Sequence, residues 1–467
     1  MKRTYSNRRY LDLLEQRVVI FDGAMGTNLQ KMNLTPAQFG GERLNGCNDA
    51  LVLSYPQAVE EIHRSFLEVG VDVIETNSFR ANRLTLGEYG LQDQVLKINR
   101  TAAGLARRLA DEYSRTGQSR LVAGSIGPSG KLPSMNDPEL SNINFDQLAD
   151  IFREQARGLI EGGVDLLLIE TSQDILEVKA AINGIYQAFS ETGQNLPVQA
   201  QVTMDTTGRM LLGTDIGAVL SILEGMGIDA IGLNCSTGPE HMRESIRYLG
   251  QQSSLPISCI PNAGLPLNVD GQAVYPMEPA PFAETLFEYV NKYNLNIVGG
   301  CCGTTPAHLK LIVEKLGGRP QSSRPILNIP RLASAIQPQA MQQDPPPFLI
   351  GERLNTQGSK KFKQLILADD YESILNIANQ QVESGAHGLD VCVALTERTD
   401  ENETMRRVIK TLVPTANVPL IIDSTEPDVI ETALKNAPGR CLINSTNLES
   451  GRAKADRIFT IAKKYNA

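Results

Sequence analysis

The sequence predicts an α/β protein: a (β/α)8 TIM barrel followed by a second, incomplete (β/α) barrel of about four βα units. Short, continuously apolar runs alternate with helix-like segments, and a Pro-rich stretch divides the runs into eight and then four. Continuous apolar runs indicate strands buried on both faces, and strands separated by helices pair in parallel through right-handed crossovers. A doubly wound open sheet is the alternative architecture.

Eight apolar runs precede residue 318, and we expect them to form the strands of the first barrel. They lie at residues 17–21, 71–76, 121–125, 164–170, 198–204, 228–234, 257–261 and 296–300. Between them apolar residues return every three or four positions, as in residues 145–152, which is the period of a helix packed on strands. We therefore predict that residues 1–318 form one closed barrel.

The composition changes at residues 319–347, which are rich in Pro, Gln, Ser and Arg and end in the sequence DPPP. Proline fixes φ and lacks an amide donor, so we predict a linker without helix or sheet. Residues 348–467 then form a second series, with apolar runs at 348–351, 388–393, 418–423 and 440–444. Half a barrel leaves strand edges uncovered, so we expect the natural polypeptide to be longer or this region to be unstable.

Composition and charge exclude several classes of function. The chain has 467 residues, of which 41% are hydrophobic, and a formal net charge of −9 at pH 7. Because it is acidic and lacks a stripe of Lys and Arg, we do not expect it to bind nucleic acid. Its N-terminus lacks the apolar core of a signal peptide, and no long apolar run follows. We therefore expect a cytoplasmic protein without membrane association.

Cysteines follow two of the predicted barrel strands. Cys235 follows the sixth strand, and Cys301 and Cys302 follow the eighth inside a cluster of glycines. Because the carboxyl ends of the strands meet at one mouth of a barrel, we expect the three thiols to converge. Zinc accepts tetrahedral sulfur ligands, and three protein ligands leave a fourth position open for a substrate. We predict that these cysteines bind Zn²⁺ and form the catalytic centre.

The other cysteines are interpreted as small buried apolar residues. They are Cys47, Cys259, Cys392 and Cys441. The same interpretation, or a redox pair, is the alternative for the converging three, but adjacent cysteines among glycines serve packing poorly. None of the four histidines falls at the carboxyl end of a predicted strand, which favours metal activation over histidine catalysis.

Several motifs within residues 10–318 resemble those of homocysteine S-methyltransferase domains. They are DGAMGT (22–27), ETNSF (75–79), IGP (126–128), MNDPE (135–139), LIETSQD (168–174), GLNCSTGP (232–239), PNAGLP (261–266) and GGCCGTTP (299–306). The resemblance implies Cys235, Cys301 and Cys302 as zinc ligands and homocysteine as the substrate. A free thiol is mostly protonated at neutral pH, and coordination to zinc would make it a nucleophile for an electrophilic methyl group.

Further residues at strand ends are candidates to bind the amino acid part of the substrate. Two carboxylates could accept hydrogen bonds from its ammonium group, and the resemblance supports both of them. Two small residues in a tight turn could hold its carboxylate through their backbone amides. The predicted substrate-binding residues are Asp22, Gly23, Ala24, Glu170 and Asn234. An ordinary turn role is the alternative for Asp22. Lower-ranked candidates at the same mouth are Glu75 and Asn77.

Residues 348–467 resemble the opening of the pterin-binding barrel of methionine synthases. The motifs are FLIGERLNTQGSKKFK, QQVESGAHGLDV, VPLIIDST and CLINSTN. Carboxylates and carboxamides at strand ends can match the ring nitrogens and amino group of a pterin. We predict that Asp390, Asp423 and Asn444 bind methyltetrahydrofolate, with ordinary turn chemistry as the alternative. The family often has asparagine two positions after the first aspartate, where this chain has Cys392, so one pterin contact differs here.

Together these resemblances imply the homocysteine module and part of the folate module of a cobalamin-dependent methionine synthase. The methyl donor would be methylcobalamin bound by a corrinoid domain or protein outside this chain. The enzymatic alternative is a corrinoid-independent homocysteine S-methyltransferase that uses S-methylmethionine or betaine. The non-enzymatic alternative is a non-catalytic zinc-binding remnant.

Overall fold

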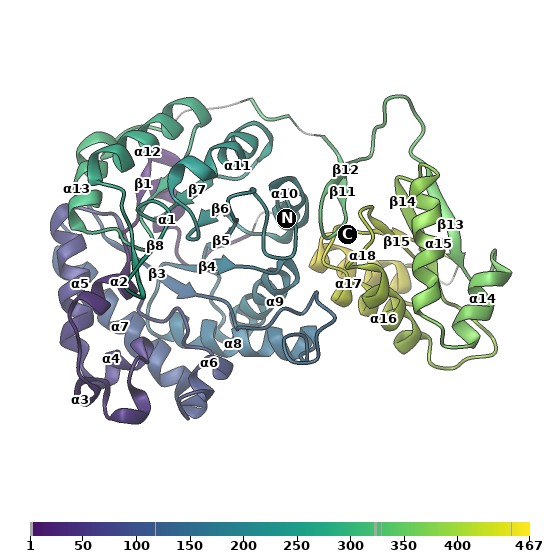
Figure 1. Ribbon diagram of the computed structural model, residues 1–467, viewed down its shortest axis with the longest axis horizontal. Coiled ribbons are helices and arrows are strands. Elements are labelled where there is room, and N and C mark those ends of the chain that lie inside the picture. Colours follow the sequence, from purple (N-terminus) through teal and green to yellow (C-terminus); the bar gives the residue numbers. More distant parts are fainter. Residues whose placement is uncertain (1–2, 117, 322–324, 328, 450) are drawn as a thin grey trace.

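Eight parallel strands form the barrel of the first unit (Figure 1). The computed structural model describes residues 3–116, 118–321, 325–327, 329–449 and 451–467. The strands are β1 (Val19–Ile20), β2 (Val73–Glu75), β3 (Leu121–Ile126), β4 (Leu166–Ser172), β5 (Val198–Val202), β6 (Ala230–Asn234), β7 (Ile257–Ile260) and β10 (Ile297–Val298). Their order is β1-β10-β7-β6-β5-β4-β3-β2, and a parallel bridge between Phe21 and Val73 joins the two ends. The predicted barrel class is confirmed.

Helices surround this barrel, as their apolar periodicity predicts. They are α1 (Arg9–Gln16), α2 (Met25–Lys31), α3 (Pro36–Phe39), α4 (Leu51–Ser54), α5 (Pro56–Val69), α6 (Arg83–Gly87), α7 (Val95–Tyr113), α8 (Phe145–Glu161), α9 (Ile175–Thr192), α10 (Ile216–Leu223), α11 (Pro239–Gln252), α12 (Pro279–Tyr293) and α13 (Pro306–Leu316). At α8, Asn144 and Gln147 form a capping box that satisfies free amides of the first turn. In the described part of the chain, no helix has the length and apolar character needed to span a membrane.

Three aspartates close the floor of the barrel. Asp72, Asp165 and Asp229 precede β2, β4 and β6, and each accepts a backbone N–H of the neighbouring strand at 3.0, 2.8 and 2.7 Å. Arg17 pairs with Asp72 at 2.6 Å, and Arg107 pairs with Asp165 at 2.6 Å. A buried carboxylate needs such charged and amide partners. Structural ion pairs therefore occupy the amino-terminal end of the barrel strands. The carboxyl-terminal end is the place to look for a functional site.

His63 in α5 should destabilise the fold in acid. Its side chain is buried, neither ring nitrogen has a hydrogen-bond partner among the described residues, and burial lowers its pKa from 6.5 to about 4. Protons therefore bind the unfolded chain more strongly, so stability is full above pH 6.5 and is lost as the pH falls towards 4. From pH 7 to pH 5, we expect the free energy of unfolding to drop about 2 kcal/mol more in the wild type than in His63→Phe. Urea denaturation measures both, and equal losses would contradict the prediction.

The second unit is a parallel sheet of four strands in the order β13-β14-β15-β16. The strands are β13 (Ile350–Asn355), β14 (Gly388–Cys392), β15 (Leu420–Asp423) and β16 (Leu442–Asn444). Its helices are α14 (Lys360–Leu367), α15 (Glu372–Glu383), α16 (Glu401–Leu412), α17 (Pro427–Asn436) and α18 (Arg452–Tyr465). The four predicted units are confirmed. The first strand, expected at 348–351, instead continues to Asn355, because Leu354 is fully buried and pairs with Val391.

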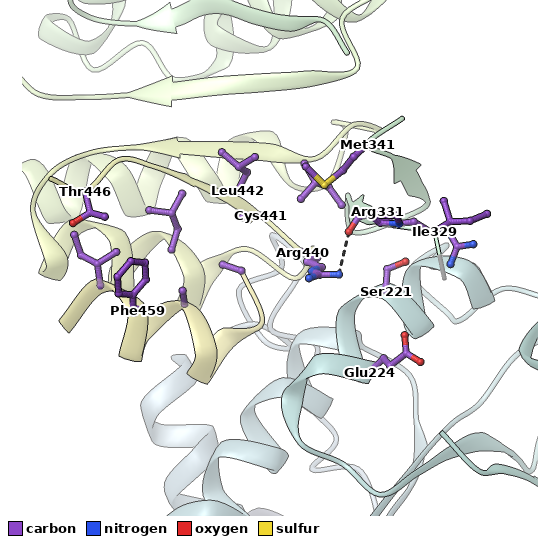
Figure 2. A pocket seen from close by; sticks show the side chains of 16 residues that line it. Ser221, Glu224, Ile329, Arg331, Met341, Arg440, Cys441, Leu442, Thr446 and Phe459 are labelled. Carbon is purple, nitrogen blue, oxygen red and sulfur yellow. Dashed lines mark hydrogen bonds between the residues drawn. The ribbon is translucent and has the colours of Figure 1, made fainter. Parts of the chain in front are cut away.

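The prediction that the linker lacks sheet is wrong. Strands β11 (Arg331–Ala333) and β12 (Pro338–Ala340) form an antiparallel hairpin. The Ala333 N–H donates to Arg440 O at 3.1 Å, so the second unit supplies a partner that the linker sequence does not reveal. Figure 2 shows the cavity of about 550 Å³ beside this hairpin, where Arg440 Nη1 donates to Arg331 O at 3.2 Å. Contacts with the second unit thus stabilise a hairpin that the Pro-rich composition of the linker disfavours.

The two units pack against each other beside α9 and α10 (Figure 1). The Lys179 ammonium, fully buried in α9, donates to Ala437 O at 2.8 Å. The Asn466 amide donates to Ile222 O at 2.9 Å, and the rings of Phe145 and Tyr465 lie 5.6 Å apart. These buried polar and aromatic contacts hold the second unit against the first.

Candidate active site

A cavity of about 410 Å³ lies at the carboxyl ends of the barrel strands. Most of the predicted site residues line it: Asp22, Gly23, Ala24, Glu170, Cys235, Cys301 and Cys302. Asn234 is fully buried and is not among the lining residues. The barrel therefore brings together residues that are more than two hundred positions apart in the sequence, as the strand topology predicts.

The three sulfur atoms converge on one point. The Sγ atoms of Cys235, Cys301 and Cys302 all lie within 4.8 Å of one another, and those of Cys235 and Cys302 are 3.9 Å apart. Cys235 has φ +60°, which turns its side chain away from the course of β6. The Cys301 N–H donates to Pro261 O at 2.8 Å and fixes the end of β10 against the loop after β7. These two backbone features help to bring the sulfur atoms together.

These thiols suit a tetrahedral metal ion. Zinc–sulfur bonds of about 2.3 Å imply sulfur–sulfur separations of about 3.8 Å in a tetrahedron, close to the observed contact. Within the described ranges, this is the one group of three metal-binding side chains whose ligand atoms are so close. Hydrogen bonds from Cys235 and then from Cys301 lower the pKa of Cys302 to about 3. Hydrogen bonds within the cluster and burial raise the pKa values of Cys235 and Cys301, so Cys302 is the thiol that most readily takes the thiolate form, which binds metal.

A second feature of the cavity is a set of buried carboxyl groups. Burial, and to a smaller extent a negative charge on Cys302, raise the pKa of Glu170 to about 7, although the hydrogen bond from Ser125 lowers it. Burial, and then repulsion by Glu170, raise the pKa values of Glu75 and Asp22, although the Glu75 N–H donates to Asp22 at 3.1 Å. Among the described residues that line the cavity, Arg80 is the one cation, and it pairs with Glu88. A cationic group entering the cavity would relieve this repulsion.

Asn234 holds Glu170 in place. Its amide donates to Glu170 Oε2 at 3.0 Å and to Thr171 Oγ1 at 2.8 Å, and its oxygen accepts the Thr171 N–H at 2.7 Å. Thr171 has φ +58°, a conformation that a β-branched residue rarely adopts. Ser125, at the end of β3, donates to the other oxygen of Glu170. Asn234 therefore contacts a carboxylate that lines the cavity and links it to the end of β6, which Cys235 follows.

The turn after β1 is tightly packed. A Cβ at Gly23 would lie 2.7 Å from Thr304 Oγ1 and 2.8 Å from the Phe66 ring, so only glycine fits. The Ala24 N–H donates to Thr304 Oγ1 at 3.2 Å. The predicted carboxylate-binding turn thus lies at the cavity, with one of its two amides already bonded to the loop after β10.

Sequence reasoning missed Ser125, which lines the cavity, and Asn262, which lies near the adjacent cysteines but does not line the cavity. Ser125 ends an apolar run and carried no other signal. Asn262 lies in the PNAGLP motif, is buried, and its Oδ1 has no hydrogen-bond partner among the described residues. Its neighbour Ala263 donates its N–H to Cys302 O at 2.9 Å. Asn262 therefore offers an unpartnered buried acceptor near the loop that carries Cys301 and Cys302. Such an acceptor fits a site that binds a group able to donate a hydrogen bond.

Among the candidate folate residues, Asp423 and Asn444 end β15 and β16, and Asp390 lies within β14, two residues before its end. Asn355 donates to Asp390 at 3.0 Å and to Asp423 at 2.9 Å, which brings the two predicted carboxylates together. Asn444 pairs in register with Asp423, and its side chain is exposed. Sequence reasoning missed Asn355, although it ends the GERLN motif. Cys392 is buried at the end of β14.

Comparisons with known proteins agree with the resemblance read from the motifs. The homocysteine S-methyltransferase family profile matches residues 19–316, and the pterin-binding enzyme profile matches residues 351–467. Methionine synthase of Mycobacterium tuberculosis is 41% identical over 448 residues, which are 96% of this chain and 37% of that protein. Methionine synthase of Mycobacterium leprae is 40% identical over 453 residues, with the same coverage of 96% and 37%. The chain therefore spans about 37% of the length of these relatives.

Solved structures show the same fold. The oxidised form of the homocysteine methyltransferase MmuM from Escherichia coli has a TM-score of 0.52 and 22% identity, covering 66% of this chain and 98% of that one. Its metallated form also has a TM-score of 0.52 and 22% identity, covering 65% and 98%. At this level of identity the likeness supports the barrel architecture of the first unit.

Proposed function

Because the chain belongs to the homocysteine S-methyltransferase family, we propose that its first unit transfers a methyl group to the sulfur of homocysteine at a zinc ion held by Cys235, Cys301 and Cys302. One observation carries this proposal: the three sulfur atoms lie within 4.8 Å of one another on a cavity at the barrel mouth. Zinc bound there would supply a Lewis acid that keeps the substrate thiol deprotonated near neutral pH.

The protein's own residues bind and orient the amino acid part of the substrate. Glu170, Asp22 and Glu75 surround the cavity with carboxylates that an ammonium group would neutralise. Asn234 and Ser125 occupy both oxygens of Glu170 and so fix the direction in which it accepts further hydrogen bonds. The buried walls exclude water, which strengthens these interactions.

The second unit points to a folate-dependent system. We propose residues 1–318 as the homocysteine domain, 319–347 as the linker and 348–467 as part of a methyltetrahydrofolate domain. Both named relatives are methionine synthases, which supports a role as modules of such an enzyme. Methylcobalamin on a corrinoid domain or protein is then the proposed methyl donor and partner. The cytoplasmic location remains a prediction from the sequence.

Methionine formation from homocysteine tests this proposal. Zinc-loaded protein is supplied with methylcobalamin, S-methylmethionine or betaine, with and without prior removal of metal by a chelator. We expect zinc-dependent turnover with methylcobalamin. Turnover only with S-methylmethionine or betaine would replace the proposed donor, and no turnover with any donor would favour the non-catalytic remnant.

A further inference from the structure

The cavity of about 550 Å³ beside the β11–β12 hairpin is lined by the first unit, the linker and the second unit (Figure 2). Ser221 and Glu224 come from the first unit, in α10 and directly after it, and residues 329–332 come from the linker. Residues 440–443 come from the second unit, around the start of β16. Small-molecule sites occupy about 300–1,000 Å³ and are frequent at domain interfaces. The cavity therefore has room for a ligand that the proposed methyl transfer does not assign.

Two arginines line this cavity, and the structure gives them only neutral hydrogen-bond acceptors. Arg331 Nη2 donates to the Gln252 side chain, and Arg440 Nη1 donates to Arg331 O at 3.2 Å. Arg440 Nε is buried and has no partner among the described residues. Burial lowers the pKa of Arg440, although the nearby charge of Glu224 raises it. A partly buried cation without a paired anion is costly, so an anion in the cavity would stabilise it.

Glu224 does not supply that anion. It is the one acidic side chain among the described lining residues, and it forms no ion pair with Arg331 or Arg440 there. Its Oε1 instead accepts hydrogen bonds from the Ser254 N–H at 2.6 Å and from Ser254 Oγ at 2.5 Å. Two guanidinium groups thus share the cavity with one carboxylate that is already bonded elsewhere. The lining carries a net positive charge.

The far end of the cavity is apolar. Figure 2 shows Thr446 and Phe459 at one end and Arg331 at the other, with Leu442 between them. Phe459, on α18, is 56% exposed, and Met341, directly after β12, is 43% exposed. Covering such side chains contributes about 25 cal/mol per Å² of apolar surface removed from water. A hydrocarbon chain would cover them.

We propose that this cavity binds a carboxylate that carries an apolar chain, with the carboxylate on Arg331 and Arg440 and the chain on Leu442 and Phe459. The planar guanidinium group matches a carboxylate through two parallel N–H bonds, and the unpartnered Nε of Arg440 offers one of them. A ligand held there contacts the linker and both units at once. It therefore stabilises their packing against each other.

Isothermal titration calorimetry of the whole protein tests this inference with octanoate, octanol and acetate. We expect one octanoate to bind per chain. Octanol and acetate should bind at least roughly tenfold more weakly, because octanol lacks the charge and acetate lacks the chain. Octanol binding as tight as that of octanoate would contradict recognition by the arginines. Absence of octanoate binding would overturn the site.

Variants place the bound octanoate. Arg440→Gln removes a guanidinium group, and Phe459→Ser removes an apolar surface. The control Arg247→Gln alters an exposed arginine of α11 that pairs with Glu244 and does not line the cavity. We expect octanoate affinity to fall roughly tenfold in Arg440→Gln and in Phe459→Ser, and to stay unchanged in Arg247→Gln.

Circular dichroism shows whether each variant is folded. Phe459 is largely exposed, so its replacement leaves the core intact and tests the site even if Arg440→Gln does not fold. Wild-type affinity for octanoate in either folded variant would overturn the proposed site. None of these measurements depends on methyl transfer, so their outcome is independent of the proposed function.

Discussion

Replacing Cys302 with alanine is expected to abolish both zinc binding and methyl transfer while the barrel stays folded. Cys302 contributes one of three sulfur atoms, 3.9 Å from that of Cys235, and two sulfur ligands do not complete a catalytic zinc site. Its side chain is only partly buried, so removing it leaves no large cavity in the core. Metal content per chain, methionine formation and circular dichroism of Cys302→Ala measure the three effects.

Cys259→Ala provides the matched control. Cys259 is fully buried on β7 and its sulfur contacts Met242, away from the sulfur cluster. We expect this variant to keep one zinc per chain and full turnover, with a modest loss of thermal stability. Equal zinc content and turnover in Cys302→Ala and Cys259→Ala would refute the site assignment.

The second large effect concerns recognition of the substrate amino group. Glu170→Gln keeps the shape of the side chain and its contact with Ser125, but removes the negative charge that faces the cavity. A hydrogen bond between a carboxylate and an ammonium group in a buried site contributes about 3 kcal/mol, so KM for homocysteine should rise roughly a hundredfold. Zinc content should not change. Steady-state kinetics and metal analysis on the same sample test both expectations.

Glu177→Gln is the control for this substitution. Glu177 is also a buried carboxyl, but it lies in α9, binds Ser129 and does not line the cavity. Its replacement should leave KM for homocysteine unchanged. If Glu170→Gln and Glu177→Gln showed the same KM as the wild type, Glu170 would not be an acceptor for the substrate.

The convergence of the thiols was predictable from the sequence because it follows from topology alone. Apolar runs mark the strands, parallel strands place their carboxyl ends together, and the cysteines follow two of those ends. The direction of each side chain was not predictable. Asn234, predicted to bind the substrate, has its side-chain amide hydrogen-bonded to Glu170 and Thr171. These contacts accompany a positive φ at Thr171, which the sequence does not reveal.

The elements that were missed depend on contacts between distant segments. The β11–β12 hairpin has its partner Arg440 a hundred residues further along the chain, and the linker composition gives no sign of it. The hairpin of β8 (Leu267–Val269) and β9 (Gln272–Val274) did have a local signal, the Asp270-Gly271 pair between two short runs, with φ values of +51° and +82°. Every strand residue of this hairpin is exposed. The hairpin therefore lacks the continuous apolar run that marks the barrel strands.

X-ray absorption at the zinc edge shows whether the sulfur of homocysteine joins three cysteine sulfurs at zinc. The measurement compares zinc-loaded protein alone with protein saturated with homocysteine. We expect three sulfur neighbours at about 2.3 Å in the first sample and four in the second. Fewer than three sulfur neighbours in the first sample, or an unchanged number after homocysteine is bound, would contradict it.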